Sequence, residues 1–180
     1  MKLEILSENN RNYFAAAQEL YETAFPYLEK RDESEQARIM RNPAYKYGLI
    51  LSDDGDFDGI MLYWETSSFV YLEHFAIQPD KRNQGRATNA LEILKAQSNK
   101  LIILEIDPPC DKISERRYSF YRKNGFIMNT YRHIQPKYHF GDADLELKIL
   151  TYPREITTTE YSQFSDFLAH EVVSKIKSDN

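Results

Sequence analysis

The stretch with the clearest capacity for chemistry is PDKRNQGRATNAL, residues 79–91, which lies between a strand-like run and a helix-like run. A helix N-terminus offers unpaired backbone N–H groups and a positive dipole end, so it can bind phosphate. Gly85 lets the backbone approach a ligand, and Ala87 is small enough to leave the amides open. Arg82 and Arg86 add charge for a diphosphate. The loop is therefore either a phosphate cradle or a plain solvated turn.

Two common phosphate-binding loops do not fit this stretch. It contains no Gly-Lys-Ser/Thr sequence, which excludes a P-loop. It also lacks the second and third glycines of a dinucleotide-binding turn. One glycine and two arginines alone are a weak signal, so the rest of the chain has to decide.

An acidic motif at residues 54–65 matches the calcium-binding pattern D-x-D-x-D-G-x5-E in full. That pattern requires a loop between two helices. Here YGLILS precedes the loop and IMLYW lies within it, and both are strand-like. A strand over 59–65 would hold Glu65 far from the aspartates. We predict an acidic β-hairpin turn and no metal site, and we keep a calcium-binding domain as a third hypothesis.

Composition limits the class of protein. The chain has 180 residues and one cysteine, Cys110, so it fits one domain without an intrachain disulfide, as expected in a reducing compartment. A net charge of −5 and a pI near 5.4 argue against a nucleic-acid or anionic-membrane partner. No run of about 18 apolar residues occurs. We expect a soluble cytoplasmic protein.

Hydrophobic periodicity predicts the elements that position the loop. The expected strands are 2–6, 47–52, 59–65, 69–78, 101–106, 126–134 and 144–150. The expected helices are 10–30, which Pro26 ends or kinks, 33–40, 113–124 and 159–177. Another helix is expected to carry the apolar stripe Ala87, Ala90, Leu91 and Leu94. Gly125 is expected as a left-handed C-cap, and Thr157 to Thr159 as N-caps.

The order of these elements predicts the fold class. A hairpin pairs its strands antiparallel, whereas the strand-helix-strand crossover from 69–78 to 101–106 implies parallel pairing. The expected fold is therefore α/β, with a central mixed sheet and helices on both faces. We expect residues 1–180 to form a single domain.

Two motifs in this order resemble those of one family. Residues 82–87 match Arg/Gln-x-x-Gly-x-Gly/Ala, and 119–126 (SFYRKNGF) resemble a second signature in which a tyrosine near a helix end precedes Gly-Phe. The motifs, their spacing and the topology resemble the GNAT (GCN5-related) N-acetyltransferases. YLEHFAI at 71–77, Glu-x-x-Pro-Pro at 105–109 and Arg-Arg-x-x-Phe-Tyr at 116–121 resemble a bacterial subgroup of poorly defined substrate.

The resemblance implies acetyl-CoA as co-substrate. The backbone N–H groups from Gln84 to Ala87 would hold the pyrophosphate, and the strand 75–77 would pair with the pantetheine amides, with an N–H near Phe75 on the thioester carbonyl. Ser114 stands where the family often has an asparagine that contacts CoA. The implied CoA-binding residues are Phe75, Ala76, Ile77, Arg82, Asn83, Gln84, Gly85, Arg86, Ala87, Ser114, Tyr118 and Tyr121.

The same resemblance names two catalytic candidates. Tyr121 matches the general acid, since a phenol is protonated at neutral pH; the alternative is a core aromatic. Glu73 matches a strand position that supplies the base, directly or through water. In a regular strand the His74 side chain would point to the face opposite Glu73. The bulge that the family has at this position would change the face to which His74 points. Tyr71, Tyr63 and Trp64 either line the acceptor site or simply pack.

The implied activity is acetyl transfer from acetyl-CoA to a primary amine of a small-molecule or peptide acceptor. The alternative is a catalytically weak CoA-binding or sensing module of the same fold. Residues 26–35 occupy the region that shapes the acceptor pocket in the family. Arg116 and Arg117 form either a solvated helix face or a contact to CoA phosphates or Glu105. A monomer and a homodimer both fit this fold.

Overall fold

The computed structural model describes residues 1–139 and 141–173, and the chain divides into two compact units. The first unit contains residues 1–26 and 33–102. The second contains residues 27–32 together with the chain from residue 103 onward. The segment 27–32 therefore belongs to the second unit, although the residues before and after it in the sequence belong to the first. Each unit is described by itself below.

The first unit is built on an antiparallel sheet of β1 (Lys2–Ile5), β2 (Tyr45–Leu51), β3 (Phe57–Glu65) and β4 (Phe69–Ile77), in that order. β2 and β3 form the hairpin predicted around the acidic motif. Their register pairs Leu51 with Phe57 beside the turn and Tyr45 with Trp64 at the far end. Glu65 therefore lies a full strand length from the turn aspartates, as the hairpin interpretation requires.

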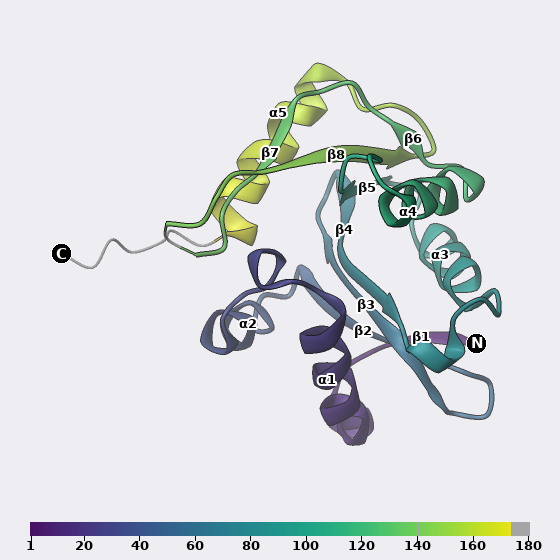
Figure 1. The fold of residues 1–180 in the computed structure, drawn as a ribbon. Helices are drawn as coiled ribbons and strands as arrows, with labels where there is room; N and C mark the ends of the chain where they lie inside the picture. Colours follow the sequence, from purple (N-terminus) through teal and green to yellow (C-terminus); the bar gives the residue numbers. More distant parts are fainter. Residues whose placement is uncertain (140, 174–180) are drawn as a thin grey trace. The chain divides into compact units, whose positions relative to one another are not determined.

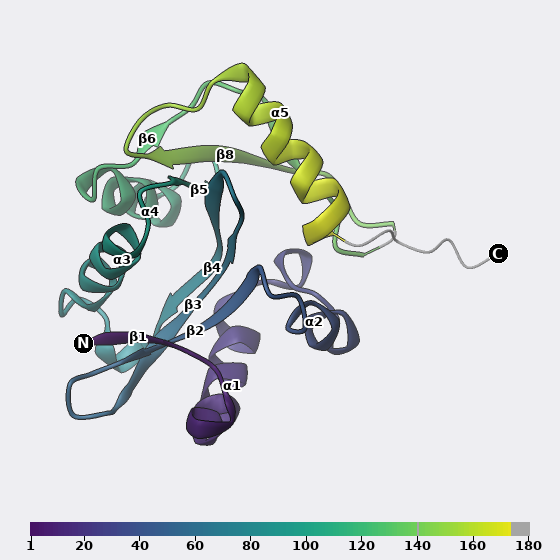
Figure 2. The same ribbon diagram turned by 180° about the vertical axis from the view of Figure 1, so that it is seen from behind.

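Three helices belong to this unit, namely α1 (Phe14–Ala24), α2 (Glu33–Ile39) and α3 (Arg86–Gln97). α1 packs on β3 and β4, and α3 packs on β1 and β4. Figures 1 and 2 show α1 and α3 on opposite faces of the β1–β4 sheet. Each helix buries one apolar stripe, as period-3.6 spacing predicts, and the buried side chains are Ala17, Leu20 and Tyr21 of α1 and Ala90, Leu91 and Leu94 of α3.

The predicted first helix, 10–30, is too long. A 3-10 turn at Glu8–Tyr13 precedes α1, which ends at Ala24. Phe25 has φ −119° and ψ 140°, an extended conformation. Pro26 causes this ending because its ring disfavours a helical backbone in the residue before it. The chain then forms only a short 3-10 turn at Tyr27–Glu29.

The second unit contains α4 (Lys112–Lys123), β8 (Leu145–Tyr152), α5 (Thr158–Phe167) and most of β5 (Leu101–Ile106). The first two residues of β5 belong to the first unit. β8 lies beside β5 and pairs antiparallel with two short strands, β6 (Ile127–Met128) and β7 (His133–Gln135). The predicted single strand 126–134 is wrong, because the chain leaves the ladder between β6 and β7.

The structure tests the predicted N-cap of α5 and part of its predicted C-terminal end. Thr157 is its N-cap, as expected, and accepts a hydrogen bond from the Glu160 backbone N–H. A π-helical turn, Leu168–Val172, follows the helix. The part of the predicted helix that covers 174–177 lies outside the described residues. Gly125 follows α4 with φ 81°, which confirms the predicted left-handed cap.

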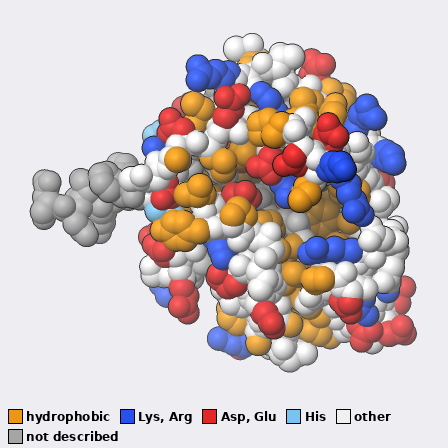
Figure 3. All heavy atoms as spheres, viewed as in Figure 1, with side chains coloured by type: hydrophobic (Ala, Val, Ile, Leu, Met, Phe, Trp, Pro, Cys, Tyr) orange, Lys and Arg blue, Asp and Glu red, His pale blue; other side chains and the backbone are white. Residues whose placement is uncertain are grey.

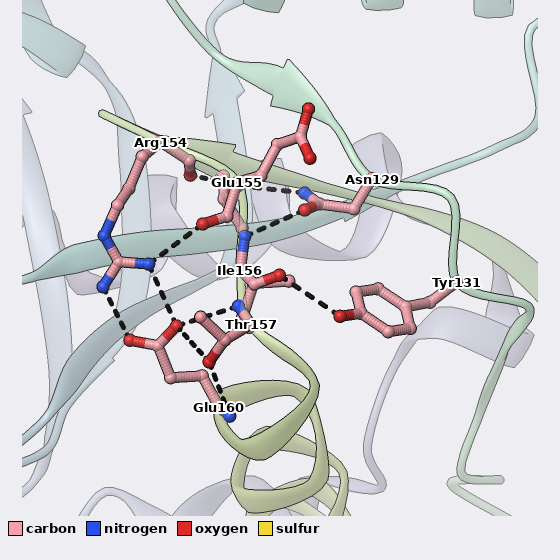
Figure 4. Close-up of polar contacts among 8 residues, drawn as sticks. Asn129, Tyr131, Arg154, Glu155, Ile156, Thr157 and Glu160 are labelled. Carbon is pink, nitrogen blue, oxygen red and sulfur yellow. Dashed lines mark hydrogen bonds and ion pairs between the residues drawn. The ribbon is translucent and has the colours of Figure 1, made fainter.

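Asn129 follows β6, where the break between β6 and β7 begins (Figure 4). Its side-chain oxygen accepts from the Ile156 backbone N–H at 2.9 Å, and its Nδ2 donates to Thr151 Oγ1 at 2.9 Å and to the Ile149 carbonyl at 3.3 Å. The residue is buried. Because a buried polar group has to be hydrogen-bonded, these contacts hold the chain before α5 against β8.

An exposed ion pair adds to the same turn. Arg154 Nη2 and Nη1 donate to the two Glu160 carboxylate oxygens at 2.7 and 3.0 Å, and Glu160 also accepts from the Thr157 N–H at 2.9 Å. Arg154 and the Thr157 backbone lower the pKa of Glu160 to about 2. The pair and the cap together fix where α5 begins (Figure 4).

Charged side chains are mixed over the surface. On the face drawn in Figure 3, acidic, basic and apolar side chains are interspersed. Among the helices that the structure describes, none combines the length and the apolar run that a bilayer crossing needs.

The two kinds of contact around α5 should differ in their effect on stability. We expect Asn129→Ala to lower the free energy of unfolding by about 3 kcal/mol, because it leaves the Ile156 N–H buried without an acceptor. Arg154→Ala is the control, with an expected loss of at most about 1 kcal/mol, because its ion pair is solvated. Urea denaturation followed by circular dichroism measures both. Equal losses would contradict the role given to Asn129.

Candidate active site

The phosphate-loop candidate has the backbone shape that the sequence predicts. Gly85 is the N-cap of α3 with φ 75°, and Asn83 has φ 60°. No side chain caps the helix, so its first N–H groups face outward from Arg86 onward. A Cβ added at Gly85 would meet no atom within 4 Å, so the space beside these amides is open. An uncapped helix end with open space beside its first amides has the geometry of an anion-binding site.

The two loop arginines have different surroundings. Arg86 Nη1 donates to Asp58 Oδ2 at 2.7 Å, and Asp58 on β3 is fully buried. Arg82 Nε donates to the Ile77 carbonyl at 3.0 Å, and its terminal nitrogens bind no other residue in the described part of the chain. Arg82 thus keeps donors available for a ligand. Arg86 is anchored, and it ties the loop to the sheet.

The loop follows the end of β4, and β4 pairs closely with β3 at Gly59. β3 pairs Met61, Ile60 and Gly59 with Phe75, Ala76 and Ile77. A Cβ on Gly59 would lie 2.3 Å from the Ala76 carbonyl oxygen, so a larger residue would push β4 away. The three predicted pantetheine-pairing residues are therefore held rigidly by β3.

A β-bulge lies at Glu73. Leu62 pairs with His74 and Tyr63 pairs with Leu72, which leaves Glu73 as the extra residue. The bulge brings neighbouring side chains to the same side, since His74 Nδ1 lies 4.0 Å from Glu73 Oε2. The opposite-face placement expected for a regular strand does not occur, and the bulge expected from the resemblance is present.

The Glu73 carboxylate is enclosed. Its side chain is 1% exposed, and Trp64 Nε1 donates to Oε2 at 2.8 Å. The His74 ring makes edge contacts with Tyr21 at 5.0 Å and with Phe25 at 4.7 Å between ring centroids, both T-shaped. Trp64 thus holds the candidate base, and the end of α1 holds His74.

α4 carries the other predicted residues. Ser114, Tyr118 and Tyr121 follow the i, i+4, i+7 spacing of one helix face. The Ser114 hydroxyl accepts from the backbone N–H groups of Cys110 and Asp111 at 3.1 and 3.0 Å, within a capping box whose other half is the Asp111 carboxylate. Its contact with CoA stays a prediction, and its hydroxyl already has local partners.

Tyr121 has the surroundings of a protonated acid. The residue is 8% exposed, and its ring packs T-shaped against Phe120 at 5.1 Å and Phe126 at 5.6 Å between centroids. Burial raises the pKa of its phenol to about 12, and the nearby Arg117 charge opposes that rise. Its hydroxyl makes no hydrogen bond to another described residue, so its proton can be given to a ligand.

The structure adds a polar cluster that the sequence did not indicate. His133 on β7 bonds through Nε2 to Glu105 on β5 and through Nδ1 to the hydroxyl of Tyr161, at 3.3 Å. The His133 and Glu105 side chains are 3% and 4% exposed. The sequence analysis placed Glu105 in a motif and among the alternative partners of Arg116 and Arg117, but nothing in the local sequence connects it to a histidine 28 residues away.

Comparison with known proteins fits this geometry. No protein-family model matches the chain. YjbC of Bacillus subtilis, provisionally assigned as an acetyltransferase, is 27% identical over 104 residues, which are 57% of this chain and 52% of YjbC. The chain thus spans about half the length of this curated relative. A Bacteroides thetaiotaomicron protein provisionally assigned to the GNAT acetyltransferases has a TM-score of 0.88 and 25% identity, over 96% of this chain and 98% of its own.

The chain has the fold of the GNAT acetyltransferases. A spermidine N-acetyltransferase from Vibrio cholerae, solved with CoA and spermine, shares the fold with a TM-score of 0.60 at 12% identity, over 89% of this chain and 97% of its own. The predicted fold class, an α/β structure with a mixed sheet flanked by helices, is confirmed. Residues of the predicted site belong to both units, and their roles remain predictions.

The anchor between the loop and the sheet can be tested by stability. We expect Asp58→Asn to lower the free energy of unfolding by about 2 kcal/mol, because Arg86 loses a buried countercharge while the side chain keeps its shape. Asp56→Asn in the same hairpin is the control, since its side chain is 70% exposed and its contact with Lys81 is 3.9 Å. Urea denaturation gives both values. A neutral Asp58→Asn would remove the anchor role of Arg86.

Proposed function

We propose that this chain is a GNAT-family N-acetyltransferase that moves an acetyl group from acetyl-CoA to a primary amine. We also propose that residues 1–180 act as one catalytic domain, since the match to the Bacteroides protein extends over 96% of the chain. The observation that carries the proposal is the open, uncapped start of α3 at Gly85, in a fold that family members use for acetyl transfer.

The chain has the groups that would hold acetyl-CoA, which supplies the activated acetyl group when bound. The N–H groups from Gln84 to Ala87 would bind the pyrophosphate, with Asn83 and Gly85 setting the backbone direction. Arg82 would add a cation, whereas Arg86 keeps the loop attached to Asp58. The strand Phe75–Ile77 would pair with the pantetheine. Ser114 and Tyr118 on α4 would also contact the coenzyme. The Vibrio cholerae neighbour, solved with CoA, supports this assignment.

The catalytic roles follow from protonation. Tyr121, with a pKa raised to about 12, holds its proton at neutral pH and would give it to the departing thiolate. Glu73, fixed by the Trp64 indole, is the base candidate from the family resemblance. A backbone N–H near Phe75 would polarise the thioester carbonyl.

The acceptor is proposed only as a class. A primary amine on a small molecule or a peptide fits the chemistry, and the Vibrio cholerae neighbour acts on spermidine.

The cytoplasmic location and the monomer or homodimer state expected from the sequence stay predictions, as does the absence of nucleic-acid and membrane partners. A screen of amines that includes spermidine, an aminoglycoside and a short peptide, with released CoA detected by a thiol reagent, would identify the acceptor.

The loop assignment predicts a specific loss of binding. We expect Gly85→Val to weaken acetyl-CoA binding at least tenfold, because a β-branched residue cannot keep φ near 75° and the amides turn away. Isothermal titration calorimetry with acetyl-CoA measures the affinity. Gly141→Val is the matched control, since Gly141 has φ 84° and also no atom within 4 Å of an added Cβ. Equal affinity in wild type and Gly85→Val would show that this loop is not the cradle.

Tyr121→Phe separates an enzyme from a CoA-binding module. We expect the turnover number to fall about 100-fold or more while acetyl-CoA affinity stays within about twofold, because only the proton donor is removed. Tyr131→Phe, a tyrosine outside the proposed site whose hydroxyl donates to the Ile156 carbonyl, should leave the rate nearly unchanged. Steady-state rates with an amine from the screen give the result, and an unchanged rate in Tyr121→Phe would remove it as the acid.

A further inference from the structure

A line of four side chains connects α2 to the candidate base within the first unit. Its members are Gln36 on α2, Tyr45 on β2, Trp64 on β3 and Glu73 on β4. Gln36 Nε2 donates to the Tyr45 hydroxyl at 3.0 Å, and the Tyr45 ring contacts the Trp64 ring. Trp64 Nε1 in turn donates to Glu73 Oε2 at 2.8 Å. Each contact joins one element to the next, so the line crosses the sheet from the helix to the bulge of β4.

The strand register fixes the middle of this line. Tyr45 lies directly opposite Trp64 in the β2–β3 ladder, so the two side chains share a face of the sheet. Their ring centroids are 5.0 Å apart and their planes meet at 65°, which is a T-shaped contact. Tyr45 is 5% exposed and Trp64 is 0% exposed, so neither ring can turn without moving the other. The position of the Tyr45 ring therefore helps to define the direction of the Trp64 indole.

Gln36 fixes the outer end of the Tyr45 ring. The residue is 5% exposed, and its Nε2 atom binds the Tyr45 hydroxyl. Its Oε1 atom is buried and accepts no hydrogen bond from the residues that the structure describes. A buried amide with one unpaired atom costs stability, so stability is not what this side chain supplies. Gln36 instead supplies the position of the tyrosine hydroxyl.

The indole N–H is well suited to hold a base, because it can only donate. It neither accepts nor releases a proton near neutral pH, so it does not compete for the proton that Glu73 would take. The Glu73 side chain is 1% exposed, so contacts with the protein rather than with water set its direction. Glu73 is also the extra residue of the bulge, which the ladder leaves unpaired. The bond from Trp64 supplies the constraint that the ladder does not.

We propose that Trp64 is the positioning residue of the base Glu73, and that α2 acts on this base through Gln36 and Tyr45. This role rests on the proposed function. In the step that it serves, R–NH3+ and the Glu73 carboxylate become R–NH2 and the neutral acid, which later releases the proton to water. Trp64 keeps the carboxylate aimed and exchanges no proton itself. Gln36 and Tyr45 keep the indole aimed.

Replacement of a single atom tests the role of Trp64. The chain contains one tryptophan, so expression with benzothienylalanine puts sulfur in place of this one indole N–H and keeps the shape of the ring. With spermidine, an aminoglycoside or a short peptide as the probe, whichever is acetylated, we expect kcat to fall about tenfold. The KM for acetyl-CoA should stay within about twofold, because no coenzyme contact changes. Asn129→Ala, which loses buried hydrogen bonds in the second unit, is the control and should keep the wild-type kcat.

Variants of Gln36 and Tyr45 separate position from stability. Gln36→Met alone should lower the melting temperature, because it removes the donor to a buried hydroxyl. Gln36→Met with Tyr45→Phe removes both partners of that bond, so the melting temperature should recover. We expect kcat of this double variant to stay about threefold low, because the Tyr45 ring is no longer tied to α2. Recovery of kcat together with the melting temperature would show a merely structural role. Arg38→Met, exposed on the same helix, is the matched control and should match wild type.

A spectroscopic measurement of the indole bond needs no acceptor. One tryptophan gives one indole peak in a proton–nitrogen correlation spectrum. We expect Glu73→Gln to move the proton resonance of this peak upfield, because a neutral amide is a weaker acceptor than a carboxylate. The double variant of Gln36 and Tyr45 should also move the peak, whereas Arg38→Met should not. An unmoved peak in Glu73→Gln would overturn the contact, and an unmoved peak in the double variant would overturn the part given to α2.

The outcomes separate this inference from the function on which it rests. Absence of acetyl-CoA binding together with no amine acetylated would overturn the proposed function and the positioning role with it. Acetylation at the wild-type kcat by the benzothienylalanine protein would overturn Trp64 alone. An equal fall of kcat in Asn129→Ala would trace the loss to stability and would also overturn Trp64. The wild-type kcat in Glu73→Gln would remove Glu73 as the base and leave Trp64 nothing to position.

Discussion

A carboxylate that leaves water must gain a hydrogen-bond donor or lose its charge, and this constraint organises the functional regions of the protein. The side chains of Asp58, Glu73 and Glu105 are 0%, 1% and 4% exposed, and each is bound by a donor, respectively an arginine, an indole N–H and a histidine. Glu29 is half-buried, and burial together with the Asp107 and Glu105 charges raises its pKa to about 7. Burial with a donor thus makes Asp58, Glu73 and Glu105 into fixed anchors.

Two local departures from regular backbone structure mark the proposed coenzyme side. The left-handed Gly85 starts α3 without a side-chain cap, and the bulge at Glu73 turns two successive side chains toward one another. Neither departure would persist in isolation, because each gives up local hydrogen bonds or chain entropy. β3 holds both, since it pairs along β4 and supplies Asp58 to Arg86. The rigid hairpin is therefore what keeps the loop in a binding shape.

Short-range patterns were sufficient for much of the fold. The stripe from Ala87 to Leu94, the apolar run of β5 and the hairpin around the acidic motif each depend on spacing within one element. The errors arose where a side chain binds at a distance. The predicted strand 126–134 is interrupted next to Asn129, whose amide binds residues 20 and more positions away. The bond between His133 and Glu105 depends on tertiary packing, for which a single sequence has no local signal.

Burial sets the proposed acid apart from an exposed phenol. It raises the Tyr121 pKa to about 12, so the phenol keeps its proton at neutral pH. The charge of Arg117, four residues earlier on α4, opposes that rise. A phenol that stays protonated in the resting protein can donate to the departing thiolate, which is the task of the proposed acid. Glu73, held by the Trp64 indole, is the proposed base, so a hydrogen bond fixes the base and burial keeps the acid protonated.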